Sequence, residues 1–311
     1  MRIVYFIILF KFVCNYAKNQ GLTNSLANIS HENLLDNPWF TVNQRGQSTY
    51  SFNYGYTLDR WKIENQSLNV TTNSDGTITI TNNGSDNGQL LQKLEKPLLS
   101  NMKGTLSIDV ISYTGNVKVF YALAVSPWNG LIYFTVDKTG IISKAENIPN
   151  LSSYGEGETK VFISLDAGAS ITVKAIKLET GSVSTLHMDS APNYQQELAK
   201  CQRYYEQNSW YSWNVKANLD GVIDVMTSYP FLVKKRVNNI TTNILKQNIG
   251  NGQLVDLTTS TLIPSNEVTI SQPVAYNSRM ESIKITHNSI ISGHTYYFSI
   301  GDDCIAFSAD L

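Results

Sequence analysis

The chain has 311 residues, of which 42% are hydrophobic and 16% charged, and its formal net charge is -1. This length and composition fit a globular protein with room for two domains that each bury a core. The longest basic run is Lys234–Arg236, which argues against nucleic acid as the main partner, because phosphate binding needs concentrated positive charge.

Residues 1–32 are expected to be a leader or attachment segment. The apolar run from Ile3 to Phe10 ends at Lys11 and is too short to span a bilayer, so no membrane span is predicted. The basic start and apolar run suit a signal peptide, although Ala17 offers a poor cleavage site. Export and a hydrophobic leader that packs on a neighbour both stay open.

Residues 33–180 are predicted to form an antiparallel β-domain. Alternating apolar and polar segments are separated by turn clusters such as NNGSDNG and DKTG, and no helical period intervenes. Strands at this spacing without crossover helices indicate a sandwich or barrel. The expected strands are 76–81, 104–110, 117–125, 131–136, 160–165 and 170–178.

A linker with one short connector helix is predicted over 181–209. Large side chains recur at spacings of four, three and four, as on one helical stripe: Tyr194, Leu198, Cys201 and Tyr205. Asp189 or Ser190 is expected to cap the helix, with Pro192 in its first turn. A helix this short is marginal alone in water, so it needs either the adjacent domains or the same helix in two other chains.

A second, smaller β-domain is predicted over 210–311, with strands at 222–226, 229–235, 240–246, 267–274, 282–287, 295–300 and 304–311. The sequence therefore predicts an all-β protein: a β-sandwich, a short connector α-helix and a C-terminal β-domain.

Six motifs, read in order, resemble a family of bacteriophage tail-fibre and minor structural proteins. They are NLLDNPWFTVNQRG (33–46), YTLDRWKI (56–63), QLLQKLE (89–95), VSPWNG (125–130), KAIKLETGSVST (174–185) and NYQQELAKCQRYYEQ (193–207). The resemblance covers about residues 34–207. It implies that the sandwich is a jelly roll like those of carbohydrate-binding modules.

The resemblance also implies a structural virion component, made in the host cytoplasm. Such a protein contacts host-surface carbohydrate alongside other tail proteins, commonly as a homotrimer. The alternative is a secreted or surface-anchored bacterial lectin-like protein, in which the leader is a true signal. A processed N-terminus would favour that alternative.

Aromatic residues in turns and after the helix are the candidate glycan-binding residues. Trp128 lies beside Asn129 in a turn, and an exposed aromatic face stacks on the apolar face of a sugar ring. Trp128 could instead cover one end of the sandwich. Trp210, Tyr211 and Trp213 follow the helix, where they either bind glycan or pack against the distal domain or a neighbouring protomer.

No cofactor is expected to be required, but the sequence offers a structural Ca²⁺ site. Asp36, with Asp59 or Glu179, could supply the oxygen ligands that hard cations prefer. Jelly-roll carbohydrate modules, which the chain resembles, often hold such an ion. Trp61 is expected in the core with Arg60 at its rim.

The sequence predicts no enzyme, because no convergent set of catalytic residues is recognised. Glycoside hydrolysis needs two carboxylates about 5–10 Å apart. The adjacent pair Asp302 and Asp303 is expected in a hairpin turn, facing opposite ways. Three cysteines are too few for a disulfide scaffold or a zinc site, and Cys201 and Cys304 are expected to be buried thiols.

Overall fold

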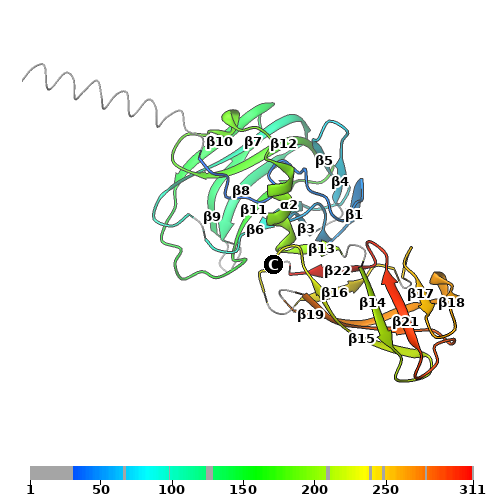
Figure 1. The fold of residues 1–311 in the computed structure, drawn as a ribbon. Coiled ribbons are helices and arrows are strands. Elements are labelled where there is room, and N and C mark those ends of the chain that lie inside the picture. The colour runs from blue at the N-terminus through cyan, green and yellow to red at the C-terminus, as the bar shows by residue number, and fades with distance from the viewer. Residues whose placement is uncertain are drawn as a thin grey trace, which may run out of the picture.

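The computed structural model describes residues 31–65, 68–97, 99–123, 129–207, 211–237, 240–246, 249–276 and 279–309. Within them, two β-rich units are joined by one α-helix, as predicted (Figure 1). In the same part of the chain, no helix is both long and apolar enough to cross a membrane.

The N-terminal unit is a jelly-roll sandwich of two six-stranded antiparallel sheets. The first sheet contains, in spatial order, β1 (Thr49–Phe52), β4 (Leu68–Thr72), β5 (Ile78–Asn82), β12 (Ser170–Thr180), β7 (Lys103–Thr114) and β10 (Gly140–Asn147). The second contains β2 (Gly55–Tyr56), β3 (Lys62–Glu64), β6 (Gly88–Lys93), β11 (Thr159–Leu165), β8 (Val117–Leu123) and β9 (Asn129–Thr135). The predicted strands of this unit are all present.

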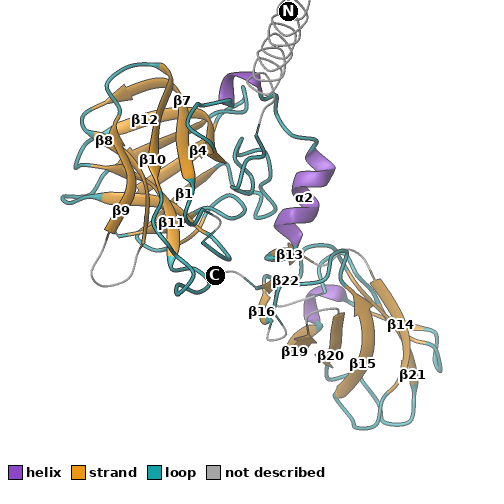
Figure 2. Ribbon diagram, turned by 90° about the vertical axis from the view of Figure 1, so that its left-hand side faces the viewer, coloured by secondary structure: helices purple, strands orange, loops and turns teal. Residues whose placement is uncertain are grey.

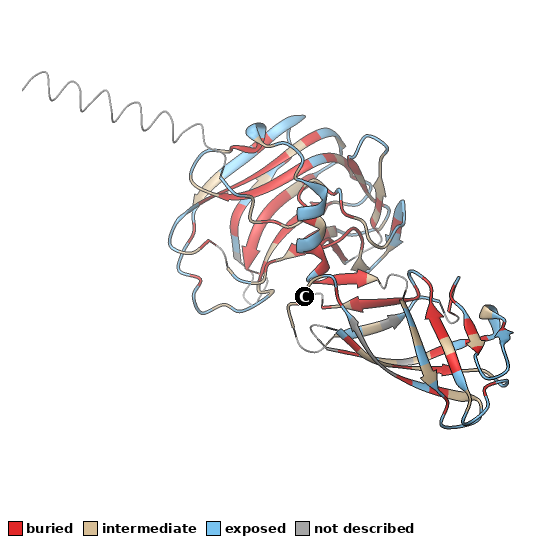
Figure 3. Ribbon diagram, in the orientation of Figure 1, coloured by how far each residue is buried: buried red, intermediate tan, exposed pale blue. Residues whose placement is uncertain are grey.

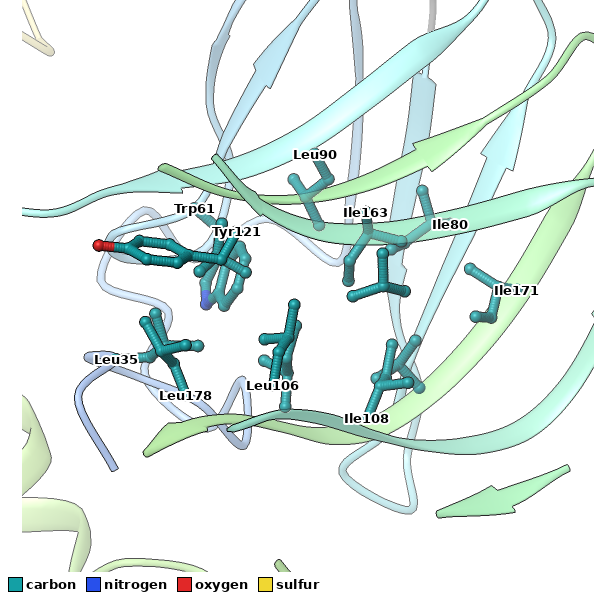
Figure 4. Close-up of a cluster of buried hydrophobic side chains, with 14 of the residues drawn as sticks. Leu35, Trp61, Ile80, Leu90, Leu106, Ile108, Tyr121, Ile163, Ile171 and Leu178 are labelled. Carbon is teal, nitrogen blue, oxygen red and sulfur yellow. The ribbon is translucent and has the colours of Figure 1, made fainter. Parts of the chain in front are cut away.

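The main hydrophobic core fills the space between these two sheets. Because side chains alternate along a strand, every second residue of a strand points toward the core, and these residues are mostly apolar. Figure 4 shows side chains from the two sheets pointing toward one another, among them Leu90, Tyr121, Ile163, Leu106, Ile108 and Leu178. Trp61 is fully buried there, as predicted. Burial of each such side chain contributes about 1.5–3 kcal/mol.

The C-terminal unit contains three smaller antiparallel sheets around a second core. The first is β13 (Tyr205–Gln207), β22 (Ile305–Ser308) and β16 (Thr241–Ile244). The second is β14 (Tyr211–Lys216), β21 (Thr295–Ile300), β17 (Leu254–Asp256) and β18 (Thr261–Ile263). The third is β15 (Val222–Pro230), β20 (Arg279–Thr286) and β19 (Thr269–Tyr276). Among the described residues, two 3-10 helices also occur: η1 (Leu186–Met188), between β12 and α2, and η2 (Ser265–Glu267), in the C-terminal unit.

The hairpin prediction for Asp302 and Asp303 was wrong. The two residues do lie in a turn, but the strands on either side, β21 and β22, belong to different sheets. The turn therefore carries the chain from one sheet to another. Cys304 directly after it is buried, as predicted.

The connector helix α2 spans Tyr194–Gln202, and its cap differs from the prediction. The side chain of Asn193, not of Asp189 or Ser190, accepts hydrogen bonds from the backbone N–H groups of the first turn. The helix also ends before Tyr205, because that residue pairs with Ser308 in the sheet of β13 and β22.

Two tyrosines after α2 dock under two arginines of the N-terminal unit. The Arg60 guanidinium lies 3.5 Å from the ring centre of Tyr204, and that of Arg45 lies 3.8 Å from the ring centre of Tyr205. Such cation–π contacts are favourable, most of all when partly desolvated. The motifs NQRG, DRW and CQRYY thus meet in space.

Figures 1 and 2 agree that α2 stands beside the sandwich and leads into β13. The buried residues of the helix are Glu197, Cys201 and Gln202. In Figure 3 the buried residues follow the strands of both units, whereas much of α2 is exposed. One side of the helix therefore packs within its own chain. The boundaries 33–180, 181–209 and 210–311 themselves stay predictions.

Candidate functional site

The second sheet of the sandwich has an outer face that is turned away from the main core. Along β11, Val161, Ile163 and Leu165 belong to the core, so the alternate residues Lys160 and Phe162 point to the other side. A separate small hydrophobic cluster forms there from Leu91, Phe120, Ala122 and Phe162. This face therefore carries apolar side chains that do not serve the core between the sheets.

A continuous row of side chains crosses this face from one edge strand to the other. Successive partners across the six strands are Tyr56, Lys62, Leu91, Phe162, Phe120 and Tyr133, which we call the outer row. Cross-strand partners share a face of a sheet. The outer row thus places aromatic rings on neighbouring strands in one line.

The aromatic rings of the outer row contact one another. Phe120 and Phe162 are buried, at 5% and 3% exposed, and the row reaches solvent at its edge through Tyr133. The ring centres of Phe120 and Phe162 are 4.7 Å apart and stacked, and Tyr133 lies 6.3 Å from Phe120. Tyr133 is 43% exposed. Near the other edge, Tyr54 is 67% exposed and accepts a hydrogen bond from the ammonium of Lys62. Exposed aromatics at both ends favour a flat ligand with apolar faces.

Basic side chains stand beside the rings, around a single glutamate. Glu64 lies 3.1 Å from Lys160, 3.3 Å from Lys62 and 3.9 Å from Lys93. Burial alone would raise the pKa of Glu64, but the hydrogen bond from Lys160 and the three positive charges lower it below its usual value. Glu64 is therefore a stable carboxylate and not a proton donor near neutral pH.

The turn aromatics predicted to bind glycan are only partly described. Trp128 and Trp210 lie outside the described residues, and Asn129 begins β9. Tyr211 and Trp213 lie on β14, where Trp213 stacks on Phe298 of β21 with ring centres 5.5 Å apart. A glycan-binding role for these residues stays a prediction.

The three carboxylates predicted to bind Ca²⁺ each already face a basic side chain. Asp36 pairs with Arg60 at 2.9 Å, and Asp59 lies 3.9 Å from Arg45. Within the described ranges, no group of three or more His, Cys, Asp or Glu side chains is placed to hold a metal ion. The calcium site stays a prediction that these contacts do not favour.

The third carboxylate, Glu179, explains the KLETGSVST motif. Glu179 lies 3.6 Å from the Lys177 ammonium and accepts a hydrogen bond of 2.8 Å from the backbone N–H of Thr185. Lys177 also pairs with Asp189 at 2.7 Å. This buried network fixes the chain after β12, so the motif closes the sandwich.

A pocket of about 480 Å³ lies between the two units. Its walls include Tyr50, Phe52 and Tyr56 from the sandwich and Tyr205 from β13. Arg45 already covers the rings of Tyr56 and Tyr205, at 5.3 and 3.8 Å from their centres. Because the aromatic faces are occupied, this pocket is the weaker candidate.

Two segments of the sequence indicate the outer row, although they lie outside the six motifs. The segments VKVFYAL and KVFISL are apolar at nearly every position and do not alternate cleanly. A strand of this kind carries apolar side chains on both faces. Phe120 and Phe162 are the residues that break the alternation.

No protein-family model and no curated protein matches the chain. Solved structures are similar to it only distantly. A carbohydrate-binding module described as CBM4 is 8% identical over 43% of this chain and 95% of the module, with a TM-score of 0.32. The CBM22-1 xylan-binding domain from Paenibacillus barcinonensis is 10% identical over 50% of this chain and 98% of that domain, with a TM-score of 0.30.

A cyclase from Fischerella sp. TAU, solved with 4-(1H-indol-3-yl)butan-2-one, is 14% identical over 50% of this chain and all of its own, with a TM-score of 0.34. The structural neighbours thus include carbohydrate-binding modules and cyclases. At such low identities and TM-scores, no ligand or activity of this chain follows from the likeness.

Proposed function

We propose that the chain is a non-catalytic glycan-binding protein, and that a sugar chain lies along the outer face of the second sheet. The observation that carries this proposal is a pair of exposed rings, Tyr133 and Tyr54, near the two edges of a sheet face that is turned away from the main core. Sugar rings have apolar faces that pack on aromatic rings and hydroxyl groups that hydrogen-bond to polar side chains.

The dimensions of the outer row favour an oligosaccharide over a single sugar. Neighbouring strands are about 4.8 Å apart, so the six strands extend over about 24 Å. Tyr133 offers an exposed ring at one edge, and Tyr54 offers another near the opposite edge. Between them, Lys93 and Lys160 are partly exposed and supply hydrogen-bond donors. A chain of sugars could contact both ends at once.

Replacing Tyr133 by alanine tests the proposal. Loss of one aromatic platform worth about 0.5–1.5 kcal/mol should weaken glycan binding about two- to tenfold. The matched control is Tyr194→Ala, which removes a similarly exposed tyrosine from α2. Binding of the full chain to an immobilised glycan panel, followed by calorimetry on the best ligand, gives the comparison. Equal weakening by both variants, or by neither, would contradict the proposed surface.

We further propose that the glycan belongs to a host cell surface and that the chain is a receptor-binding component of a phage tail. The support is the order and spacing of the six motifs, together with the contact of three of them, NQRG, DRW and CQRYY, around Arg45 and Arg60. A secreted or surface-anchored lectin-like protein is equally compatible with the outer face. Identifying the mature N-terminus by mass spectrometry distinguishes them, since export removes the leader.

The homotrimer belongs to this finer proposal and needs its own test. The helix gives little support to a threefold interface, because Cys201, Tyr204 and Tyr205 are buried within one chain. Light scattering on the full chain measures the assembled mass directly. A stable trimer supports the tail-fibre role, whereas a monomer removes the trimer and favours the lectin-like protein.

A further inference from the structure

The ionic cluster beside the aromatic rings is unbalanced in charge. Lys62, Lys93 and Lys160 surround Glu64, and within the described part of the chain no other carboxylate lies in ion-pair contact with these lysines. Three ammonium groups and one carboxylate leave two positive charges. The chain as a whole has a net charge of -1, so this excess is local.

The lysines of this cluster are partly withdrawn from water. The exposed fraction of the side chain is 21% for Lys93, 13% for Lys160 and 6% for Lys62. Burial of a charge is unfavourable unless an opposite charge compensates it. Burial, followed by the charges of Lys62 and Lys160, lowers the pKa of Lys93. An incoming anion would relieve this repulsion.

Buried lysines elsewhere in the chain are better compensated. Lys177 is fully buried and lies within 4 Å of two carboxylates, those of Glu179 and Asp189. Lys235, also fully buried, lies 2.6 Å from Glu206. In the described part of the chain, each of these buried lysines pairs with at least one carboxylate that it does not share with another lysine. A cluster that only stabilised the sheet would be expected to show the same balance.

The position of the excess charge points to the ligand. The ammonium of Lys160 lies 5.9 Å from the ring centre of Phe162, a member of the outer row. Phe162 is the cross-strand partner of Leu91, and Lys93 is the next residue on the same face of β6. A glycan that spans this face between the exposed rings of Tyr133 and Tyr54 would therefore bring its substituents next to both lysines, which are partly exposed.

We propose that the outer face selects acidic glycans, whose carboxylate or sulfate groups are held by Lys93 and Lys160 beside the aromatic row. This inference rests on the proposed glycan-binding function and names its ligand class. Lysine binds carboxylates and sulfates as a point charge, without demanding one geometry. The aromatic rings would pack against the sugar rings, and the lysines would form ion pairs with their acidic groups.

Matched pairs of polymers test the ligand class even while the sugar itself is unidentified. Polygalacturonate, alginate and hyaluronan are each compared with their methyl esters, which keep the backbone and lose the charge, and dextran sulfate is compared with dextran. Calorimetry on the full chain should give at least about tenfold tighter binding to the charged member of a bound pair. Binding should also weaken as salt rises, because exposed ionic contacts are screened.

Variants that remove a positive charge test which lysines bind the acidic group of the glycan. Lys93→Gln and Lys160→Gln should each lose about tenfold in affinity for the acidic polymer. Lys93→Arg should retain most of it. Lys144→Gln is the matched control, since it removes the same charge from an exposed position on β10 of the first sheet. An unchanged melting temperature excludes a folding defect.

The outcomes separate this inference from the proposed function. Preference for uronates or for dextran sulfate that is lost in the Lys93 and Lys160 variants supports the inference and tells the two anions apart. Equal or tighter binding of the neutral members, sensitive to Tyr133→Ala, overturns acidic selection and leaves glycan binding intact. Binding to no polymer, charged or neutral, overturns both.

Discussion

At the scale of single residues, Asn37 organises the segment that supports α2. It is fully buried with a φ of 49°, a left-handed conformation that asparagine tolerates better than most residues. Its amide nitrogen donates to the carbonyl groups of Val42 and Asp59, at 2.8 and 3.0 Å. Its backbone carbonyl accepts from the indole of Trp61, and its backbone N–H donates to Glu197 of α2.

Replacing Asn37 by alanine should lower the free energy of unfolding by about 3 kcal/mol. The change removes the hydrogen bonds from the Asn37 amide to the carbonyl groups of Val42 and Asp59 and the acceptor for the Val42 backbone N–H, and it forces alanine into a left-handed conformation. Urea denaturation of the full chain measures the loss. The control is Asn83→Ala at an exposed position, which should change stability by less than about 0.5 kcal/mol. A loss below about 1 kcal/mol for Asn37→Ala would contradict this role.

The predicted metal ligands show what the sequence could not reveal. Asp36, Asp59 and Glu179 are candidate calcium ligands because carboxylates bind hard cations. In the fold, each of these carboxylates lies next to a basic side chain, as Asp36 lies next to Arg60. Composition identifies an acidic residue, but only the three-dimensional structure identifies its nearest cation.

At the scale of elements, α2 shows how far periodicity predicts a boundary. The spacing of large residues predicts the helix and its buried Cys201 correctly. It does not predict the end of the helix, because Tyr204 and Tyr205 leave it to dock under two arginines and to pair with β22. Tertiary contacts overrode the local pattern at that end of the helix.

Removing the cap of α2 should destabilise the protein modestly. Asn193→Ala deletes the acceptor for the backbone N–H groups of Gln195 and Gln196, at 3.0 and 3.3 Å. A lost N-cap costs about 1 kcal/mol. Thermal or urea unfolding measures the difference, and Asn193→Asp, which keeps an acceptor, should remain within about 0.5 kcal/mol of the native chain. If the aspartate variant is as unstable as the alanine variant, the capping role is wrong.

The strands were easier to predict than the face that they build. Long buried strands such as β11 and β12 show clear apolar patterns. Strands β1, β4, β6 and β10 were not among the predicted strands. In the edge strand β10, most residues are exposed and the pattern is weak. The outer row was missed for another reason: it joins residues from six strands, and their register depends on pairings that one segment does not encode.

At the scale of the whole molecule, one acidic residue ties the sandwich to the C-terminal unit. Glu95 accepts a hydrogen bond from the hydroxyl of Tyr204 at 2.6 Å and lies 3.0 Å from Arg203. It also lies 3.7 Å from Arg236, which pairs in addition with Glu156. These contacts hold the two units together around α2. The sequence predicted two β-units and a connector, and docking of the connector on an adjacent domain was one of its two alternatives.

The most direct test of the outer face as a binding surface is to find which backbone amides a bound glycan protects from hydrogen exchange. Hydrogen–deuterium exchange of the full chain, with and without the tightest-binding polymer, locates the ligand without mutation. We predict slower exchange in β8, β9 and β11, which carry Phe120, Tyr133 and Phe162, and little change around Tyr211 and Trp213. Protection confined to β14 or to the pocket between the units would contradict the outer face as the binding surface.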